Sequence, residues 1–459
     1  MSLGACRLTG RIALLALAIW AVLNAAGCGT PNTAASTSGY TNRVLVSQSV
    51  TSATTFGGLV LINGNNDTLP RAPSISAGNS PGLMAITAAR NLVAAFDSSS
   101  NSVYGVSTAT EKGVGQVHIL GPTSSMVLPT SNAVGYAAVP SANILGYSVL
   151  GGVEVMNLSA GVLITTIAVS NAQTVVANNT GSQLLVFSND SNAVTLLNPA
   201  NALPPVDLSC FPSLDPNPPQ NPPVCTIING FDRPVFAIVS GSTAYILNCG
   251  AECGGTQASV QTLDLNSLAV GPPLPVNGAT WAYLSGTSLY VAGSGTPTGP
   301  LCSSLTNSIN AKTAATYCGT LDIVDLTTMT DPYFNNPATE IAIPDGYHDR
   351  MDMSNNGQLF VGSQDCTNIG DANNPVGEVR GCLAILNTQT GAVVIPPDNG
   401  DVTGLQSFTT RYVEYVAENG NLRVYDTLTD ALLINIDYIP LGTIPVIGYV
   451  TDIKAIDFF

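Results

Sequence analysis

Short runs of alternating apolar and polar residues recur along the chain, and each ends at a small polar residue and a turn. Alternation with a period of two is typical of a β-strand. The eight runs are LVLIN (59–63), VYGVS (103–107), VEVMN (153–157), VTLLN (194–198), VQTLD (260–264), LDIVD (321–325), LAILN (383–387) and LRVYD (422–426). They begin between 39 residues (Leu383 to Leu422) and 66 residues (Val194 to Val260) apart, which leaves room for one small antiparallel sheet per run.

Each run is flanked by further apolar, β-rich segments. Those that precede it are RVLVSQ (43–48), NLVAAF (91–96), AVGYAAV (133–139), QLLVFS (183–188), TAYILN (243–248), SLYVAG (288–293), QLFVGS (358–363) and YVEYVA (412–417). In seven units another short strand is predicted upstream, as at 83–87, 173–177, 234–239 and 350–354, and a fourth follows, as at 162–169 and 431–436. Four consecutive antiparallel strands are the blade of a β-propeller.

The first unit lacks its innermost strand. The C-terminal segment DIKAIDFF (452–459) is predicted to supply it, which would close the ring and hide the strand edges. We therefore predict an all-β fold, a single β-propeller of four-stranded blades closed by the C-terminal strand. The repeat count favours eight blades, and seven is the alternative if one unit is irregular.

Composition agrees with strands and tight turns rather than helices. Only 9% of the residues are charged, and the chain holds 44 Gly and 30 Pro. Because repeated units of this kind share one stacked core, residues 43–459 are predicted to form one domain.

The N-terminus reads as a targeting segment. Arg7 and Arg11 precede an apolar stretch (12–23) that is too short to span a membrane. The next residues, Ala-Ala-Gly-Cys (25–28), resemble the lipobox of bacterial lipoproteins, which implies cleavage after residue 27 and lipidation of Cys28. Residues 28–42 are then a flexible tether, and Gly29, in place of Asp, implies anchoring in the outer membrane. An ordinary secretory peptide is the alternative.

The chain is acidic, with 29 Asp and Glu against 13 Lys and Arg and a net charge of −16. Removal of residues 1–27 would take away Arg7 and Arg11 and no acid, which leaves 11 bases and a charge of about −18. Nucleic acid and anionic lipid surfaces are therefore poor partners. The membrane is expected to be contacted through the lipid anchor alone.

Eight cysteines besides Cys6 and Cys28 fall into four neighbouring couples. These are Cys210 with Cys225, Cys249 with Cys253, Cys302 with Cys318, and Cys366 with Cys382. Each couple brackets a loop rich in Pro, Gly or Asn, and local disulfides in an exported chain are the simplest interpretation. A zinc site is the alternative, although no CxxC pair occurs.

Two stretches, AGNSPGLMAITAARNLVAAF (77–96) and MDMSNNGQLFVGS (351–363), resemble the YVTN-type (YncE-like) propeller repeat. In that repeat a Gly-Pro-Gly turn leads into an inner strand, then a polar turn, then a strand reading roughly LYVAN. The matching residues are Gly78, Pro81, Gly82, Ser354, Asn355, Asn356, Gly357, Leu359, Phe360 and Val361, with SLYVAG at Ser288 as a further match. The tetrapeptide Tyr-Val-Thr-Asn, after which the repeat is named, is absent from the expected strands. The resemblance implies a propeller but no single activity, because such propellers include surface-layer and binding proteins and lactonase-like enzymes.

The cysteine loops indicate which face of the ring carries recognition. Three couples lie between the second and third strands of their predicted blades, and Cys210–Cys225 is predicted to lie between one blade and the next. Loops of these two kinds emerge on the same face of a propeller, so all four are expected to crowd that face, where binding residues usually reside. Stabilisation of an exposed protein is the alternative role.

Two stretches on that face place an aromatic residue beside Asp and Arg. They are GFDR (230–233) and GYHDR (346–350), and the candidate binding residues are Asp232, Arg233, Tyr347, His348, Asp349 and Arg350. An Arg can hold a carboxylate or sugar hydroxyls, and an aromatic ring supplies a stacking surface. The alternative is that each Asp-Arg pair ties one blade to the next.

Catalytic residues are not evident. Only His118 and His348 are available for general acid–base work by histidine. Asp345, His348, Asp349 and Asp352 include metal-ligand types, but neighbouring residues of a strand point to opposite sides. We assign no catalytic residue, metal ligand or cofactor, although a divalent metal in the central channel stays an option.

The sequence thus predicts a lipid-anchored cell-envelope propeller. It would act as a binding or scaffold module for an envelope protein or carbohydrate through the face with the disulfide loops. The alternative is a metal-dependent, lactonase-like hydrolase with its site at the channel mouth.

Overall fold

A computed structural model describes residues 38–49, 58–70, 74–129, 134–144, 147–188, 191–211, 213–215, 217, 221–295, 318–336, 338–366, 382–396, 400–435 and 448–457. The predicted signal peptide, Cys28, Cys302 and most of the tether lie outside these residues. No helix in the described part of the chain has the length and apolar character needed to cross a membrane.

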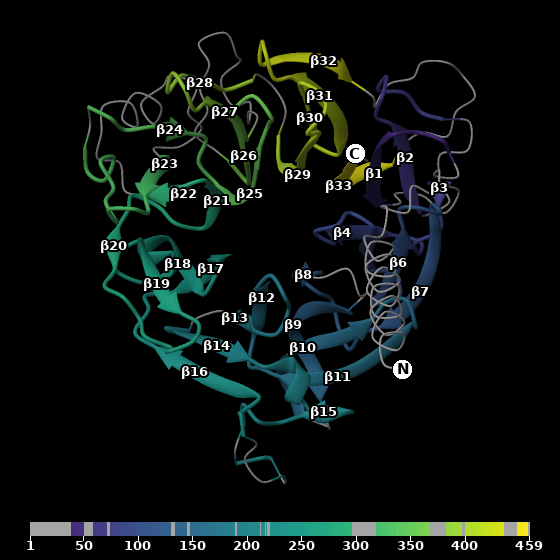
Figure 1. Cartoon of the computed structure of the whole chain (residues 1–459), viewed down its shortest axis with the longest axis vertical. Helices are drawn as coiled ribbons and strands as arrows, with labels where there is room; N and C mark the ends of the chain where they lie inside the picture. The colour runs from purple at the N-terminus through teal and green to yellow at the C-terminus, as the bar shows by residue number, and fades with distance from the viewer. Residues whose placement is uncertain are drawn as a thin grey trace, which may run out of the picture.

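Eight small sheets are arranged in a ring about a common centre, as Figure 1 shows. We name the strands of each blade A to D from this centre outward. Blade 1 holds β33 (Tyr449–Asp457), β1 (Asn42–Ser49), β2 (Leu59–Asn63) and β3 (Ser74–Ile75), and blade 2 holds β4 (Pro81–Ile86), β5 (Leu92–Asp97), β6 (Ser102–Ser107) and β7 (Lys112–His118). Blade 3 holds β8 (Ser125–Val127), β9 (Val134–Ile144), β10 (Tyr147–Asn157) and β11 (Val162–Ala168), and blade 4 holds β12 (Ala172–Ala177), β13 (Leu184–Ser188), β14 (Ala193–Leu197) and β16 (Cys225–Asn229).

The remaining four blades repeat the same order. Blade 5 holds β17 (Pro234–Ser240), β18 (Thr243–Asn248), β19 (Ser259–Asp264) and β20 (Leu274–Pro275), and blade 6 holds β21 (Trp281–Ser285), β22 (Ser288–Gly295), β23 (Cys318–Asp325) and β24 (Ala342–Ile343). Blade 7 holds β25 (Tyr347–Met353), β26 (Gln358–Gln364), β27 (Leu383–Asn387) and β28 (Val393–Val394), and blade 8 holds β29 (Val402–Ser407), β30 (Val413–Glu418), β31 (Asn421–Asp426) and β32 (Ala431–Asn435). All eight predicted runs are strand C of their blades, so the predicted count of eight is confirmed.

The hydrophobic core is a series of interfaces between neighbouring blades. Strand B of a blade is covered on both sides, and every residue of β5 is buried. By contrast, the outermost strand β7 is mostly exposed. At one interface Leu247 and Val260 of blade 5 pack in the same cluster as Leu289 and Val291 of blade 6. Burial of this kind contributes roughly 25 cal/mol per Å² of apolar surface, so each blade depends on both neighbours.

The ring closes as the sequence predicts, through the C-terminal strand. In blade 1, β33 pairs antiparallel with β1, with Val44 opposite Ala455 and Val46 opposite Ile453. Figure 1 shows the C-terminal end beside β1 and β2. Contacts from blade 8 reinforce this closure, since the main-chain N–H of Thr409 donates to Asp457 Oδ2 at 2.7 Å.

The two faces of the ring carry different connections. Connections between strands B and C, and from strand D to the next strand A, open on one face, which we call the BC/DA face. Connections between A and B and between C and D open on the opposite, AB/CD face. Cys249–Cys253 lies between β18 and β19, and Cys366–Cys382 between β26 and β27, so both lie on the BC/DA face as predicted.

The predicted position of the Cys210–Cys225 loop is wrong. Cys225 begins β16, which pairs with β14 and is strand D of blade 4, with Leu197 opposite Cys225. The loop therefore joins strands C and D and opens on the AB/CD face. The physical reason is that strand D follows the long insertion instead of preceding it. The insertion between β14 and β16 also contains β15 (Val206–Asp207), just before Cys210, and β15 pairs parallel with β11 at the outer edge of blade 3.

An ion pair between blades 1 and 8 provides a test of closure. Arg411 donates from Nη1 to Asp67 Oδ1 at 2.6 Å and from Nη2 to Oδ2 at 2.8 Å, and the Tyr415 hydroxyl also donates to Asp67. We expect Arg411→Ala to lower the free energy of unfolding by about 2 kcal/mol, because a largely buried carboxylate loses its charged partner. Chemical denaturation measures this change.

A double-mutant cycle with Asp67→Asn provides the control, since Asn tolerates the left-handed backbone of residue 67 (φ 58°). We expect Asp67→Asn to cost less in the Arg411→Ala background than in the wild-type protein. Strict additivity of the two free-energy changes would contradict the proposed coupling.

Candidate functional site

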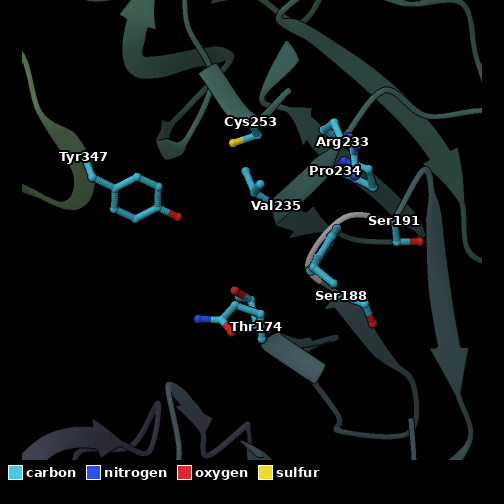
Figure 2. Close-up of a pocket in the computed structure, with 10 residues that line it drawn as sticks. Thr174, Ser188, Ser191, Arg233, Pro234, Val235, Cys253 and Tyr347 are labelled. Carbon is cyan, nitrogen blue, oxygen red and sulfur yellow. The ribbon is translucent and has the colours of Figure 1, made fainter. Parts of the chain in front are cut away.

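A cavity of about 330 Å³ lies where the innermost strands of several blades reach the BC/DA face. Its polar wall is formed by Gln173 and Thr174 of β12, by Ser188 and Ser191 beside the connection from β13 to β14, and by Arg233. Val235 of β17 also lines the cavity, and Tyr347 at the start of β25 lies across from these residues (Figure 2). Residues from blades 4, 5 and 7 therefore meet at the mouth of the channel.

Arg233 lines this cavity from the connection into β17. Its φ of 58° is a left-handed conformation that costs roughly 1–2 kcal/mol for a residue with a side chain. Two contacts hold it there: its main-chain N–H donates to Asn192 Oδ1 at 3.2 Å, and its carbonyl accepts from the N–H of Cys249 at 2.9 Å. The backbone of Arg233 is thus fixed between blades 4 and 5.

Asp232 supports the cavity wall from outside. Its Oδ2 accepts hydrogen bonds from the main-chain N–H groups of Thr256 and Gln257 at 2.8 and 2.9 Å, which fixes the loop after Cys253. Desolvation alone would raise the pKa of Asp232, but these hydrogen bonds and the charge of Arg233 hold the pKa below its ordinary value. Asp232 therefore stays ionised, and its carboxylate binds main-chain groups of its own blade.

Tyr347 presents its ring to the cavity with 47% of the residue exposed (Figure 2). Desolvation of the phenol and the nearby carboxylates of Asp349 and Glu252 raise its pKa to about 12. The hydroxyl stays protonated at neutral pH and is available as a hydrogen-bond donor.

His348 lies in the core instead of the cavity. It is 1% exposed, and its Nε2 is 2.9 Å from the carbonyl oxygen of Pro344. Burial lowers its pKa to about 4, so the ring is neutral. The hydroxyl of Thr280 on the neighbouring blade donates to the His348 carbonyl at 2.9 Å.

Asp349 and Arg350 form an ion pair at 3.2 Å. Gln364 donates to Asp349 Oδ2 at 2.6 Å, and Arg350 Nε donates to the carbonyl of Thr403 in blade 8 at 2.8 Å. This pair connects blade 7 to blade 8, which is the structural role given above as the alternative. Of the six candidate residues, Arg233 and Tyr347 are the two that line the cavity.

Glu252, which the sequence analysis did not single out, anchors the loop above the cavity. It lies in the short 3-10 turn η2 (Gly250–Cys253), and its Oε2 accepts from the main-chain N–H of Ser294 in blade 6 at 2.9 Å. The Ser294 hydroxyl donates in turn to the carbonyl of Gly346 in blade 7 at 3.0 Å. Burial raises the pKa of Glu252 to about 7. Its place between Cys249 and Cys253 is visible in the sequence, but this place does not indicate burial.

Three of the four predicted disulfides are present in the described residues: Cys210–Cys225, Cys249–Cys253 and Cys366–Cys382. The fourth, Cys302–Cys318, falls partly outside those residues and stays a prediction. Disulfides are typical of an oxidising, extracytoplasmic compartment.

Metal-ligand types do not converge in the part of the chain that the structure describes. No three side chains of His, Cys, Asp or Glu there form a group that could hold a metal ion. The described arrangement at the mouth instead offers neutral hydroxyl and amide groups, one guanidinium and one phenol.

Comparisons with known proteins identify the class through its fold. No protein-family model and no curated protein sequence matches this chain. The solved structure of dihydro-heme d1 dehydrogenase NirN in complex with DHE is similar, with a TM-score of 0.55 and 12% identity over 90% of this chain and 75% of that chain. At this identity the likeness shows the fold alone, and the class is that of the β-propellers.

Two further structures have lower TM-scores. The computationally designed Ika8 protein has a TM-score of 0.47 and 9% identity over 79% of this chain and 89% of that chain. Kuenenia stuttgartiensis hydrazine synthase has a TM-score of 0.47 and 14% identity over 77% of this chain and 95% of that chain.

The raised pKa of Glu252 predicts how stability depends on pH. In the unfolded chain this carboxyl ionises near 4.5, whereas in the folded protein it ionises near 7. Its stabilising contribution is complete below pH 4.5 and is lost as the pH rises through about 7. We expect Glu252→Gln to make the fall of the thermal midpoint between about pH 5 and 8 shallower.

Asp264→Asn is the matched control, because hydrogen bonds from Ser267 lower the pKa of this exposed acid and it does not titrate in that window. The same slope in wild type and Glu252→Gln would contradict the prediction.

Proposed function

We propose that this protein is a binding module of the bacterial envelope, with its recognition site in the cavity at the channel mouth on the BC/DA face. The group that it holds is rich in hydroxyls, such as a terminal sugar of an envelope carbohydrate. One observation carries the proposal: a cavity of about 330 Å³ combines Tyr347 with four neutral polar side chains and Arg233.

The lining chemistry supports a sugar. The hydroxyls of Thr174 and Ser188 can each donate and accept, and the Gln173 amide does both with separate atoms. The Ser191 hydroxyl adds a polar wall but is already hydrogen-bonded to the main chain of Ala193. Sugar hydroxyls need both functions. The Tyr347 ring offers an apolar face on the opposite side, against which the C–H groups of a sugar can pack.

Preorganisation also supports binding. Hydrogen bonds hold the connections around the cavity: Asn192 and Glu252 bind groups of neighbouring blades, and Asp232 binds the connection between β18 and β19 of its own blade. A ligand would meet walls that are already in place, and little conformational entropy would be lost on binding. The rigid ring would provide the scaffold on which these connections are held.

Export and lipid anchoring through Cys28 in the outer membrane belong to the same proposal, as does membership of the YVTN-type repeat proteins. The disulfides support export. A tether of residues 28–42 would give the ring a reach of roughly 20 Å by random-coil scaling.

Removal of the Tyr347 ring tests the site. We expect Tyr347→Ala to weaken binding of the recognised sugar at least about tenfold, because a packed aromatic face and a hydroxyl donor are lost. A panel of monosaccharides and disaccharides is titrated into the protein, and affinity is measured by calorimetry. Tyr412→Ala is the matched control, since Tyr412 is similarly exposed, at 52%, but precedes β30 on the AB/CD face.

Equal affinities of Tyr347→Ala and wild type would overturn the site. If no sugar in the panel binds, the carbohydrate assignment fails. A photoreactive amino acid is then placed at position 347, and its crosslinks test for an envelope protein partner. The same amino acid at position 412 measures nonspecific crosslinking.

A further inference from the structure

We propose that the Cys249–Cys253 bond is a thiol–disulfide exchange site, at which Cys253 accepts an incoming thiol from the cavity. The thiol belongs to a small molecule or to a cysteine side chain of a partner. This activity uses the cavity wall but does not depend on sugar binding.

The two sulfurs of this bond differ in accessibility. Cys249 is 1% exposed, whereas Cys253 is half-buried and lines the cavity. Figure 2 shows the Cys253 sulfur directed away from its own ribbon, toward the side on which Tyr347 lies. An attacking thiolate can therefore reach Cys253 Sγ, with the buried Cys249 Sγ as the leaving group, because access influences which sulfur is attacked.

The loop keeps its shape through contacts that do not involve the sulfurs. Within it, the N–H of Gly255 donates to the carbonyl of Gly250 at 2.7 Å. Asp232 holds the residues that follow, and Glu252 binds Ser294 of the next blade. Breaking the bond would leave these hydrogen bonds in place, so reduction and reoxidation need not unfold the blade.

A purely structural role fits the second described stapled loop of the BC/DA face better. Cys366 and Cys382 are each 1% exposed and belong to a hydrophobic cluster with Phe360 and Leu383. They also close a longer segment, with a sequence separation of 16 against 4 for Cys249–Cys253. A crosslink constrains the unfolded chain more when it closes a longer loop, so the short ring contributes less to stability.

A dithiol supplies the two electrons that reduce the Cys249–Cys253 bond. The first thiolate of the dithiol attacks Cys253 Sγ, a new S–S bond forms, and the Cys249–Cys253 bond breaks. The electron pair goes to Cys249 Sγ, which takes up the proton that the dithiol released. The second thiol of the dithiol then attacks the dithiol sulfur that is bound to Cys253. An S–S bond forms within the dithiol, and Cys253 leaves as a thiol. The dithiol is oxidised to a disulfide, and the two cysteines are reduced.

Graded reduction of the full chain tests the proposal. The folded protein is incubated with increasing dithiothreitol, free thiols are alkylated, and each cysteine peptide is quantified by mass spectrometry. We expect Cys249–Cys253 to open at a dithiothreitol concentration roughly tenfold or more below that for Cys366–Cys382, while cooperative thermal unfolding is retained. Opening at the same concentration, or only with loss of cooperative unfolding, would overturn the proposal.

A labelling experiment tests whether a thiol-reactive molecule in solution reaches the Cys253 sulfur. Cys249→Ser leaves Cys253 as a free thiol, and glutathione disulfide is the probe. We expect the glutathione adduct at Cys253 to form roughly tenfold or more faster than at Cys366 in the matched variant Cys382→Ser, because Cys366 is buried. Equal or slower labelling of Cys253 contradicts the inference. If either variant fails to fold, the reduction series on the unmodified protein decides.

Discussion

Closure of the ring by β33 is the interaction on which the rest of the structure depends. Each blade buries its apolar side chains against both neighbours, so an open ring would expose two blade faces at once. Pairing of β33 with β1 links the last segment of the chain to the first blade, and the ion pair of Asp67 with Arg411 adds a polar contact between blades 1 and 8. The closed ring also leaves no innermost strand without a partner.

The two faces of the closed ring carry different structural features. The BC/DA face has two described disulfide loops and the cavity, and its connections are tied from blade to blade by Asn192 and Glu252. On the AB/CD face, the insertion with Cys210–Cys225 reaches across to blade 3 through β15. Stapled loops thus occur on both faces: one borders the cavity, and the other belongs to an insertion whose strand β15 joins two blades.

Several buried acids are held by neutral donors, which is how a chain with 29 acids and 13 bases can bury carboxyls. Glu154 is fully buried and accepts from the Thr166 hydroxyl at 2.7 Å, and burial raises its pKa to about 7. Asp322 is 1% exposed and accepts from the N–H of Asn277 at 2.6 Å. Ionisation of such carboxyls disfavours their burial, so the packing of the blades depends on pH. The same holds for Glu252, which lies beside the cavity.

The sequence by itself determined the number of blades, strand C of each blade and the closing strand, because period-two alternation is a local property of the residues that form it. It also singled out Arg233 and Tyr347, but only the tertiary structure brought these distant residues to one cavity and buried His348 behind them. The face of the Cys210–Cys225 loop was likewise decided by strand pairing, since no local pattern indicates whether strand D precedes or follows a long insertion. Burial of Glu252 depends on blade 6, which lies outside its own stretch of sequence, and for that reason no motif could mark it.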